Sequence, residues 1–275
     1  CEGPTNQKID EEFFKLRKKF LRKTYKISAK DYQDLFISEV NRLKKIKDFD
    51  HIVLWFEFDL YCHLNMLASI SLITEQKKAG PVYLVCSKKL NGDENLKALS
   101  QLTPKQLKNH YDNKILLSQE DLEIANLIWE LYCSNNPIKL KPLIKTSSNF
   151  EYLSSCIRAH IERFPNSTTG LNSLEKNILK LIAEHTITSK HQLLGYALQY
   201  QGYYGYSDNQ MERLLKKLKK FYSIEPNKVQ LTKKGEEVLA GTKNFYQEIK
   251  NDDCFGGAKM YDFLYDSEEH RLLKL

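Results

Sequence analysis

The sequence of 275 residues lacks the features that place a chain in a membrane or outside the cell. No apolar run approaches the roughly 18–20 residues that cross a bilayer, and no secretory leader is recognisable. The six cysteines are scattered and form no Cys-x-x-Cys pair, and most of them sit in apolar patterns, where a free cysteine behaves as a small hydrophobic residue. We therefore expect a cytoplasmic protein with reduced cysteines and no membrane partner.

Three motifs of common enzymes are missing too. The chain has no glycine-rich loop of the kind that cradles phosphates, no His-Glu-x-x-His pair and no Gly-x-Ser-x-Gly elbow. These absences argue against the common NTPases, zincins and α/β-hydrolases, and they leave any cofactor unknown.

The chain is long enough for two domains with ordinary hydrophobic cores. Hydrophobic residues make up 41% and charged residues 28% of the sequence, and the mean hydropathy is −0.52. The net charge of +7 is modest, but lysines concentrate at 15–47 and at 214–234. A lysine-rich face is commonly only solvated, whereas a polyanionic partner is the more specific interpretation.

The strongest local signal is an apolar run that ends in two carboxylates. The run predicts a buried strand over 51–56, followed by Glu57 and Asp59 and then by a helix over about 60–77. A second apolar run predicts a strand over 81–86, and strand, helix, strand in this order is a right-handed parallel crossover. Ligands of open α/β sheets bind at the carboxyl ends of strands, so the sequence predicts a site there.

The residues of this predicted site have two interpretations each. Glu57 and Asp59 point to the same side if the chain stays extended, although Asp59 could simply cap the next helix. His63 lies four residues after Asp59 on the same helix face. These three are the catalytic candidates, as acid and base or around a hard or borderline divalent metal. Trp55 and Asn65 are ligand-binding candidates, with a core position and a backbone hydrogen bond as the alternatives.

The clearest domain boundary is the polar segment 164–170, which contains Pro and Gly. Before it, we expect further helices over 11–25, 29–46, from Pro104 onward, 118–133, 137–145 and 149–163. After it, helices are expected to start at Ser173, Ser189 and Asp208, followed by two short strands, 222–224 and 229–231, and a helix capped by Thr232. Three helices and a two-stranded ribbon in this order predict a winged helix.

The predicted fold is therefore α/β, with four parts. They are a Rossmann-like domain with a parallel sheet over 1–135, a helical linker over 136–163, a winged-helix domain over 164–245 and a C-terminal tail over 246–275.

The third helix of the predicted winged helix, 208–221, would be the recognition helix. Asn, Gln and Arg near its first turns are residue types that read base edges, and its lysines can hold phosphates. The nucleic-acid-binding candidates are Asn209, Gln210, Arg213, Lys216, Lys217 and Lys220. The alternative is that this domain only packs against neighbours or binds another protein.

Several short motifs are shared with a known family. They include Glu2-Gly3-Pro4, Trp55-Phe56-Glu57-x-Asp59, Gln101-Leu102-Thr103-Pro104 and Gly256-Gly257. In these motifs the chain resembles proteins that contain the domain of unknown function 1835, in the bacterial branch with an appended winged helix. The resemblance implies the architecture given above and adds Glu2 as a ligand-binding candidate, but the family has no established activity.

The sequence departs from that family at its start. Relatives usually have a further strand and an Asn-Gly-Asp-like turn before the Glu-Gly-Pro segment, whereas this sequence begins at Cys1. We therefore expect either an open sheet edge or a gap filled by a separate N-terminal fragment. Cys1 is also a catalytic candidate, because an N-terminal cysteine can use its own α-amine as a base; the alternative is a truncated or processed start without chemistry. His63 replaces a common Gln, which puts a role for an amide there in doubt.

Three hypotheses from different classes follow. The first is a DNA-binding regulator whose α/β domain senses a small-molecule ligand. The second is an enzyme, a metal-assisted or acid/base hydrolase or transferase, that uses the cluster around Glu57 and Asp59. The third is a protein-interaction adaptor with neither activity.

Overall fold

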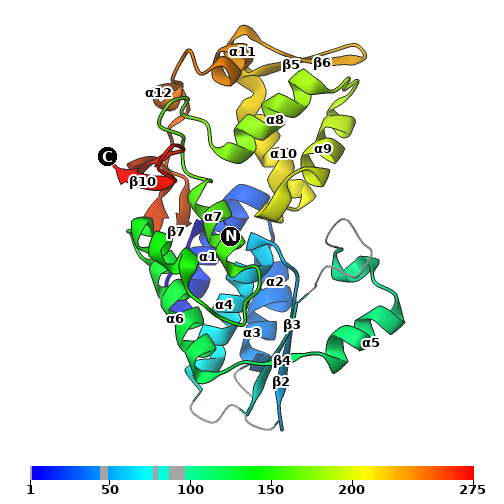
Figure 1. The fold of residues 1–275 in the computed structure, drawn as a ribbon, viewed down its shortest axis with the longest axis vertical. Coiled ribbons are helices and arrows are strands. Elements are labelled where there is room, and N and C mark those ends of the chain that lie inside the picture. The colour runs from blue at the N-terminus through cyan, green and yellow to red at the C-terminus, as the bar shows by residue number, and fades with distance from the viewer. Residues whose placement is uncertain (1, 44–48, 77–79, 87–96) are drawn as a thin grey trace. The chain divides into compact units, whose positions relative to one another are not determined.

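The computed structural model describes residues 2–43, 49–76, 80–86 and 97–275 (Figure 1). It divides into two compact units. The first unit comprises Cys1–Cys156 with Cys254–Ala258, and the second comprises Ile157–Asp253 with Lys259–Leu275. Helices and small sheets mix in the chain, so the coarse α/β class is confirmed. The division at residue 156 lies near the end of the expected linker, and part of the expected tail belongs to the first unit.

The main sheet of the first unit is built on the predicted strand–helix–strand segment. Strands β2 (Ile52–Phe56) and β3 (Val82–Cys86) pair in parallel over their whole length, and α4 (Leu60–Thr74) connects them. A third strand, β4 (Ile115–Leu116), pairs antiparallel with β3. The sheet is therefore mixed rather than wholly parallel, in the order β2-β3-β4 (Figure 1). Two residues are too few to show a strand period, which is why β4 was not expected.

The buried face of this sheet lies against α4. Residues two apart along a strand share a face, so Leu54, Val82 and Leu84 lie together, and all three are buried. Helix α4 contacts both β2 and α6 (Gln119–Cys133), which explains why it is apolar on nearly every side. On the opposite face, Trp55 and Leu116 remain 38% and 54% exposed.

The remaining helices of the first unit mostly match the expected ranges. Helix α1 (Glu11–Tyr25) begins at the Asp10 cap. The expected helix over 29–46 is present as α2 (Ala29–Tyr32), a π-helical turn (Gln33–Ile37) and α3 (Ser38–Leu43); residues 44–46 lie outside the described residues. Helix α5 (Pro104–Asp112) has the expected Thr103 cap with Pro at its first position.

Two segments after α6 follow the expected linker. The segment Pro137–Lys145 is a 3₁₀ helix rather than an α-helix. Pro142 inside it lacks the N–H of a regular α-helical hydrogen bond, which accounts for the difference. Helix α7 (Leu153–Ile161) starts four residues later than expected.

The Glu-Gly-Pro segment is not part of the main sheet. Strand β1 (Gly3–Pro4) pairs in parallel with β7 (Cys254–Gly256), close to the end of the chain. Strand β2 is thus an edge strand of the described sheet, as the expectation of an open edge requires. The separate N-terminal fragment stays a prediction.

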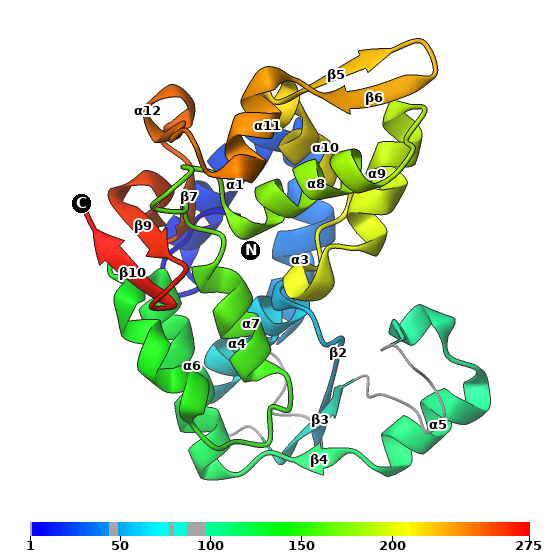
Figure 2. The ribbon, with the colours of Figure 1, turned by 45° about the horizontal axis from the view of Figure 1, so that its top comes forward.

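The second unit contains the expected series of helices and hairpin. Three helices come first: α8 (Ser173–Glu184), α9 (Lys190–Gln199) and α10 (Asp208–Lys217). They are followed by two antiparallel strands, β5 (Tyr222–Glu225) and β6 (Lys228–Leu231). Figure 1 and Figure 2 both show this hairpin extending away from the helices. Helix α11 (Lys233–Ala240) follows, with Thr232 as its cap. The cap of α8 is Asn172 and not Ser173, because Asn172 and Glu175 form a reciprocal capping box.

The expected tail is folded. Helix α12 (Tyr246–Ile249) is followed by β7, by β8 (Ala258–Lys259), and by the antiparallel pair β9 (Phe263–Asp266) and β10 (Arg271–Lys274). The backbone of Tyr265 exchanges hydrogen bonds with Pro165 and Ser167, so the predicted boundary segment is ordered by the end of the chain. These strands are two to four residues long, which is too short to show a strand period in the sequence.

Two helical glycines of the second unit make a matched pair for testing the packing. A Cβ atom on Gly235 would lie 2.2 Å from the Phe221 carbonyl oxygen, whereas one on Gly195 would meet nothing within 4 Å. We expect Gly235→Ala to destabilise the protein by about 1–3 kcal/mol, because backbone must move. Gly195→Ala should stabilise it by up to about 1 kcal/mol through helix propensity. Denaturant unfolding of both variants measures this, and equal effects would contradict the packing around α11.

Candidate functional site

The two carboxylates that follow β2 are each held by a backbone amide. Asp59 is the N-cap of α4, and its Oδ1 accepts a hydrogen bond from the Cys62 N–H at 2.7 Å. Glu57 Oε1 accepts one from the Leu99 N–H, also at 2.7 Å. Asp59 is buried and Glu57 half-buried. The capping interpretation of Asp59 is thus correct, but it does not account for all that surrounds it.

The same helix start brings a thiol to the carboxylates. A ligand atom from each of Glu57, Asp59 and Cys62 lies within 4.8 Å of the other two. In each carboxylate, one oxygen accepts the backbone hydrogen bond just described, and the second oxygen does not take part in that bond. Two oxygens and a sulfur suit zinc or another borderline divalent cation. Three protein ligands would leave a position for water or substrate.

Cys62 was not among the residues expected at this site. Burial, followed by the negative charge of Asp59, raises the pKa of the Cys62 thiol to about 12. The thiol therefore stays protonated at neutral pH unless a cation displaces its proton. Its position three residues after the capping Asp59 was the available signal, since that spacing puts both in the first turn of the helix.

His63 lies near this cluster but is engaged elsewhere. Its ring is 2% exposed, and Nδ1 donates to the Asp59 carbonyl oxygen at 3.0 Å. Burial lowers the pKa of His63, and the backbone carbonyls of Asp59 and Glu57 only partly oppose this. A neutral, buried imidazole that bonds its own helix is a structural residue first.

Trp55 and Asn65 have different surroundings. Trp55 stacks on Tyr111 of α5 with ring centroids 6.3 Å apart, and the Lys114 ammonium lies 4.2 Å from the centre of the Tyr111 ring. This partly exposed aromatic face leaves a ligand platform open to Trp55. Asn65 is exposed, and its amide donates to the Tyr61 carbonyl oxygen at 2.8 Å, which is the backbone alternative given above.

Glu2 is buried within the first unit. Its carboxylate accepts a hydrogen bond from the Tyr25 hydroxyl, and its carbonyl oxygen accepts one from Arg17 Nη1 at 2.7 Å. Arg17 also donates to the Pro4 carbonyl oxygen at 3.1 Å. These bonds tie the first residues to α1. Cys1 lies outside the described residues.

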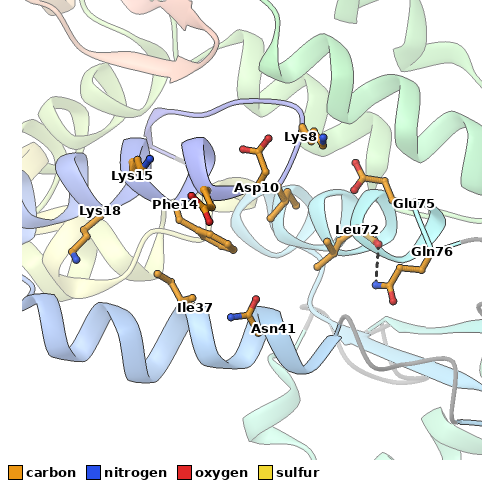
Figure 3. Close-up of a pocket in the computed structure, with 12 residues that line it drawn as sticks. Lys8, Asp10, Phe14, Lys15, Lys18, Ile37, Asn41, Leu72, Glu75 and Gln76 are labelled. Carbon is orange, nitrogen blue, oxygen red and sulfur yellow. Dashed lines mark hydrogen bonds between the residues drawn. The ribbon is translucent and has the colours of Figure 1, made fainter.

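A groove in the first unit lies away from all of these candidates. It has a volume of about 740 Å³ and runs between α1, α3 and the end of α4 (Figure 3). Apolar side chains such as Phe14 and Leu72 form part of it, and Lys15, Lys18 and Glu75 add both signs of charge. Its size is that of a small-molecule site.

In the second unit, Asp253 pairs with two of the α10 side chains that the sequence predicts to contact DNA. Asp253 Oδ1 accepts from Arg213 Nη2 at 2.8 Å, and Lys217 Nζ bonds the other oxygen. Burial alone would raise the pKa of Asp253, but Lys217 and Arg213 together lower it below its ordinary value. Both side chains are thus engaged within their own unit.

Of the other four DNA-binding candidates, one has a structural role and three are exposed. Gln210 is buried and its Oε1 accepts the Ser207 N–H at 3.1 Å, which completes a capping box. Asn209, Lys216 and Lys220 are exposed. Of the predicted set, these three are available at the surface of the unit as it stands.

Comparisons with known proteins add no identification. No protein-family model matches the chain, and neither a curated protein nor a solved structure matches it. The resemblance to proteins with the domain of unknown function 1835 therefore stays a prediction. Among the described residues, no helix has the length and apolar character that spanning a membrane requires.

Substitutions at Asp59 separate its capping role from any other. Asp59→Ala removes the acceptor for the Cys62 N–H and should cost about 1 kcal/mol of stability. Asp59→Asn keeps an acceptor at the cap and should reduce the stability by no more than a few tenths of a kcal/mol. Thermal or denaturant unfolding measures both. An Asn variant as unstable as the Ala variant would show that the charge, and not the cap, stabilises this helix start.

Proposed function

We propose that this protein is a DNA-binding regulator whose second unit contacts DNA through α10 and the β5–β6 hairpin. The order of its elements supports a winged helix, in which α10 is the recognition helix and the hairpin is the wing. The Val229 N–H of β6 also donates to the Ile187 carbonyl oxygen at 2.7 Å, so the segment between α8 and α9 lies beside the hairpin.

The observation that carries the proposal is the charge of this region. Residues 213–234 contain Arg213 and seven lysines but only one carboxylate, Glu225. Lys216, Lys219, Lys220, Lys228 and Lys233 are exposed. A basic helix followed by a basic hairpin matches the charge of a phosphate backbone.

The proposed contacts differ from the sequence-based set in their roles. Lys216 and Lys220 hold phosphates, and Asn209 is the exposed side chain near the first turn that can reach a base edge. Arg213 and Lys217 join only when they leave Asp253. The resulting binding is dominated by phosphates and depends weakly on sequence.

A salt series tests this function. Wild-type protein should bind random duplex DNA with an affinity that falls steeply with salt, because bound lysines release counterions. Lys216→Ala with Lys220→Ala should weaken binding and reduce the slope of log K against log salt by about one unit per lost contact. Lys180→Ala, an exposed lysine on α8, is the matched control. Binding that does not depend on salt, or that the double variant leaves unchanged, would refute the proposal.

Asp253→Asn adds an opposite arm to the same experiment. Removing this carboxylate charge releases Arg213 and Lys217 from their pairing with Asp253, so DNA affinity and the salt slope should both rise. A variant that folds normally but binds no more tightly would show that these two side chains do not face DNA.

A second candidate function concerns the first unit, where we propose a divalent metal site. The specific observation is the approach of Glu57, Asp59 and Cys62 to within 4.8 Å. A cation held there would polarise a bound water or a substrate oxygen, which is the metal-assisted form of the enzyme hypothesis. The cluster supports the metal site, and the reaction that we propose for it is that of a hydrolase or transferase.

The groove of Figure 3 supports the separate proposal that this unit senses a small molecule.

Cobalt titration tests the metal site without assuming an activity. Co²⁺ should give a thiolate-to-metal absorption band that Cys62→Ser abolishes and that Cys254→Ser, outside the cluster, leaves in place. Because binding must displace the thiol proton, affinity should rise about tenfold per pH unit below the Cys62 pKa of about 12. Asp59→Asn should weaken binding while keeping the cap. A band that persists in Cys62→Ser, or no band at all, would rule out this site.

A further inference from the structure

A small cavity in the second unit is lined by charged and polar side chains, of which the proposed DNA binding uses only Lys220 and, once it leaves Asp253, Lys217. Its volume is about 180 Å³, which is room for several waters. It lies between the start of α8, the end of α10 and the segment that follows α12. Residues that line it include Glu175, Lys217, Lys220, Asn251 and Tyr261.

Glu175 is the buried carboxylate of this cavity. The residue is 4% exposed, and its Oε2 accepts the Asn172 N–H at 2.8 Å. No hydrogen bond to Oε1 occurs among the residues that the structure describes. Burial raises the pKa of Glu175, and the hydrogen bond from the Asn172 N–H and then the charge of Lys217 only partly oppose this. A bound donor would give this oxygen the hydrogen bond that it lacks within the described residues.

Tyr261 adds a second polar group beside it. The residue is 8% exposed, and its backbone carbonyl oxygen accepts the Tyr246 hydroxyl. Its own hydroxyl makes no hydrogen bond within the described part of the chain. Burial raises the pKa of Tyr261, as does the charge of Glu175, so the hydroxyl stays protonated and can donate. A carboxylate and a phenol thus both line the cavity.

The lysines supply the opposite charge. Lys217 Nζ is bonded to Asp253, but Lys220 is exposed and, among the residues that the structure describes, makes only a long hydrogen bond, 3.4 Å, to the Glu248 carbonyl oxygen. Its ammonium group retains donors for another acceptor. A ligand that only carried positive charge would be repelled by the two lysines, and one that only carried negative charge by Glu175.

We propose that this cavity binds a small zwitterion, a compound with a primary ammonium and a carboxylate such as a free amino acid with a small side chain. The ammonium bonds Glu175 Oε1, and the carboxylate bonds the Lys220 ammonium and the Tyr261 hydroxyl. This binding shares Lys220 with the proposed DNA contact, so glycine and DNA compete for its ammonium group, whereas the metal site is separate.

Calorimetric titration with glycine, methylammonium and acetate tests the proposal on the full chain. Glycine should bind, and the two single-charge probes should bind at least about tenfold more weakly, because each lacks one charged hydrogen bond. Glu175→Gln should reduce the affinity for glycine at least about tenfold. This variant keeps an oxygen that accepts the Asn172 N–H, so the α8 cap is preserved, and its thermal unfolding verifies the fold.

Lys220→Ala should also weaken glycine binding, whereas Lys219→Ala, its exposed neighbour that does not line the cavity, should not. Loss of affinity in both Glu175→Gln and Lys220→Ala supports the site. Failure of glycine to bind the wild-type protein overturns it. So does unchanged affinity in a folded Glu175→Gln variant, or equal binding of methylammonium and glycine.

Discussion

The start of α4 is the constraint on which the first unit depends. This helix is buried between the sheet and α6, so it must begin where β2 ends and cannot expose its unpaired amides to water. Asp59 meets that need by capping the helix. The cap holds the carboxylate against Cys62, and the same turn of chain places Glu57 beside them. A requirement of folding thus assembles the donor set that we propose as a metal site.

Asp253 has a comparable role in the second unit, where it neutralises one flank of α10. Arg213 and Lys217 are one helical turn apart, and both bind its carboxylate. Because the group is partly shielded from water, this pairing is stronger than a surface ion pair. It also removes two positive charges from the surface that we propose for DNA. The stability of the folded unit and its affinity for a polyanion therefore draw on the same side chains.

The sequence predicted the long elements well and the short ones poorly. Strands β2 and β3, helix α4 and the helices of the second unit have clear periods or caps, and they lie within a few residues of their expected ranges. Strands β1, β4 and β7–β10 have two to four residues each, too few to show a period, and β1 and β4 pair with strands far away in the chain. At the site, the sequence predicts Glu57 and Asp59, whereas the apolar pattern around Cys62 predicts a small hydrophobic residue there. The pairing of Arg213 with Asp253 spans 40 residues and left no local signal.

The edge position of β2 has a consequence for the protein at high concentration. Its five residues, 52–56, are all apolar, it belongs to a parallel pair, and its outer side has no partner in the described sheet. Such an edge offers a row of amide and carbonyl groups to any extended chain. It contains no proline or charge that would prevent pairing. Unless another segment covers it, this strand is the place where self-association into larger aggregates would begin, and a lysine in the strand is the substitution that would suppress it.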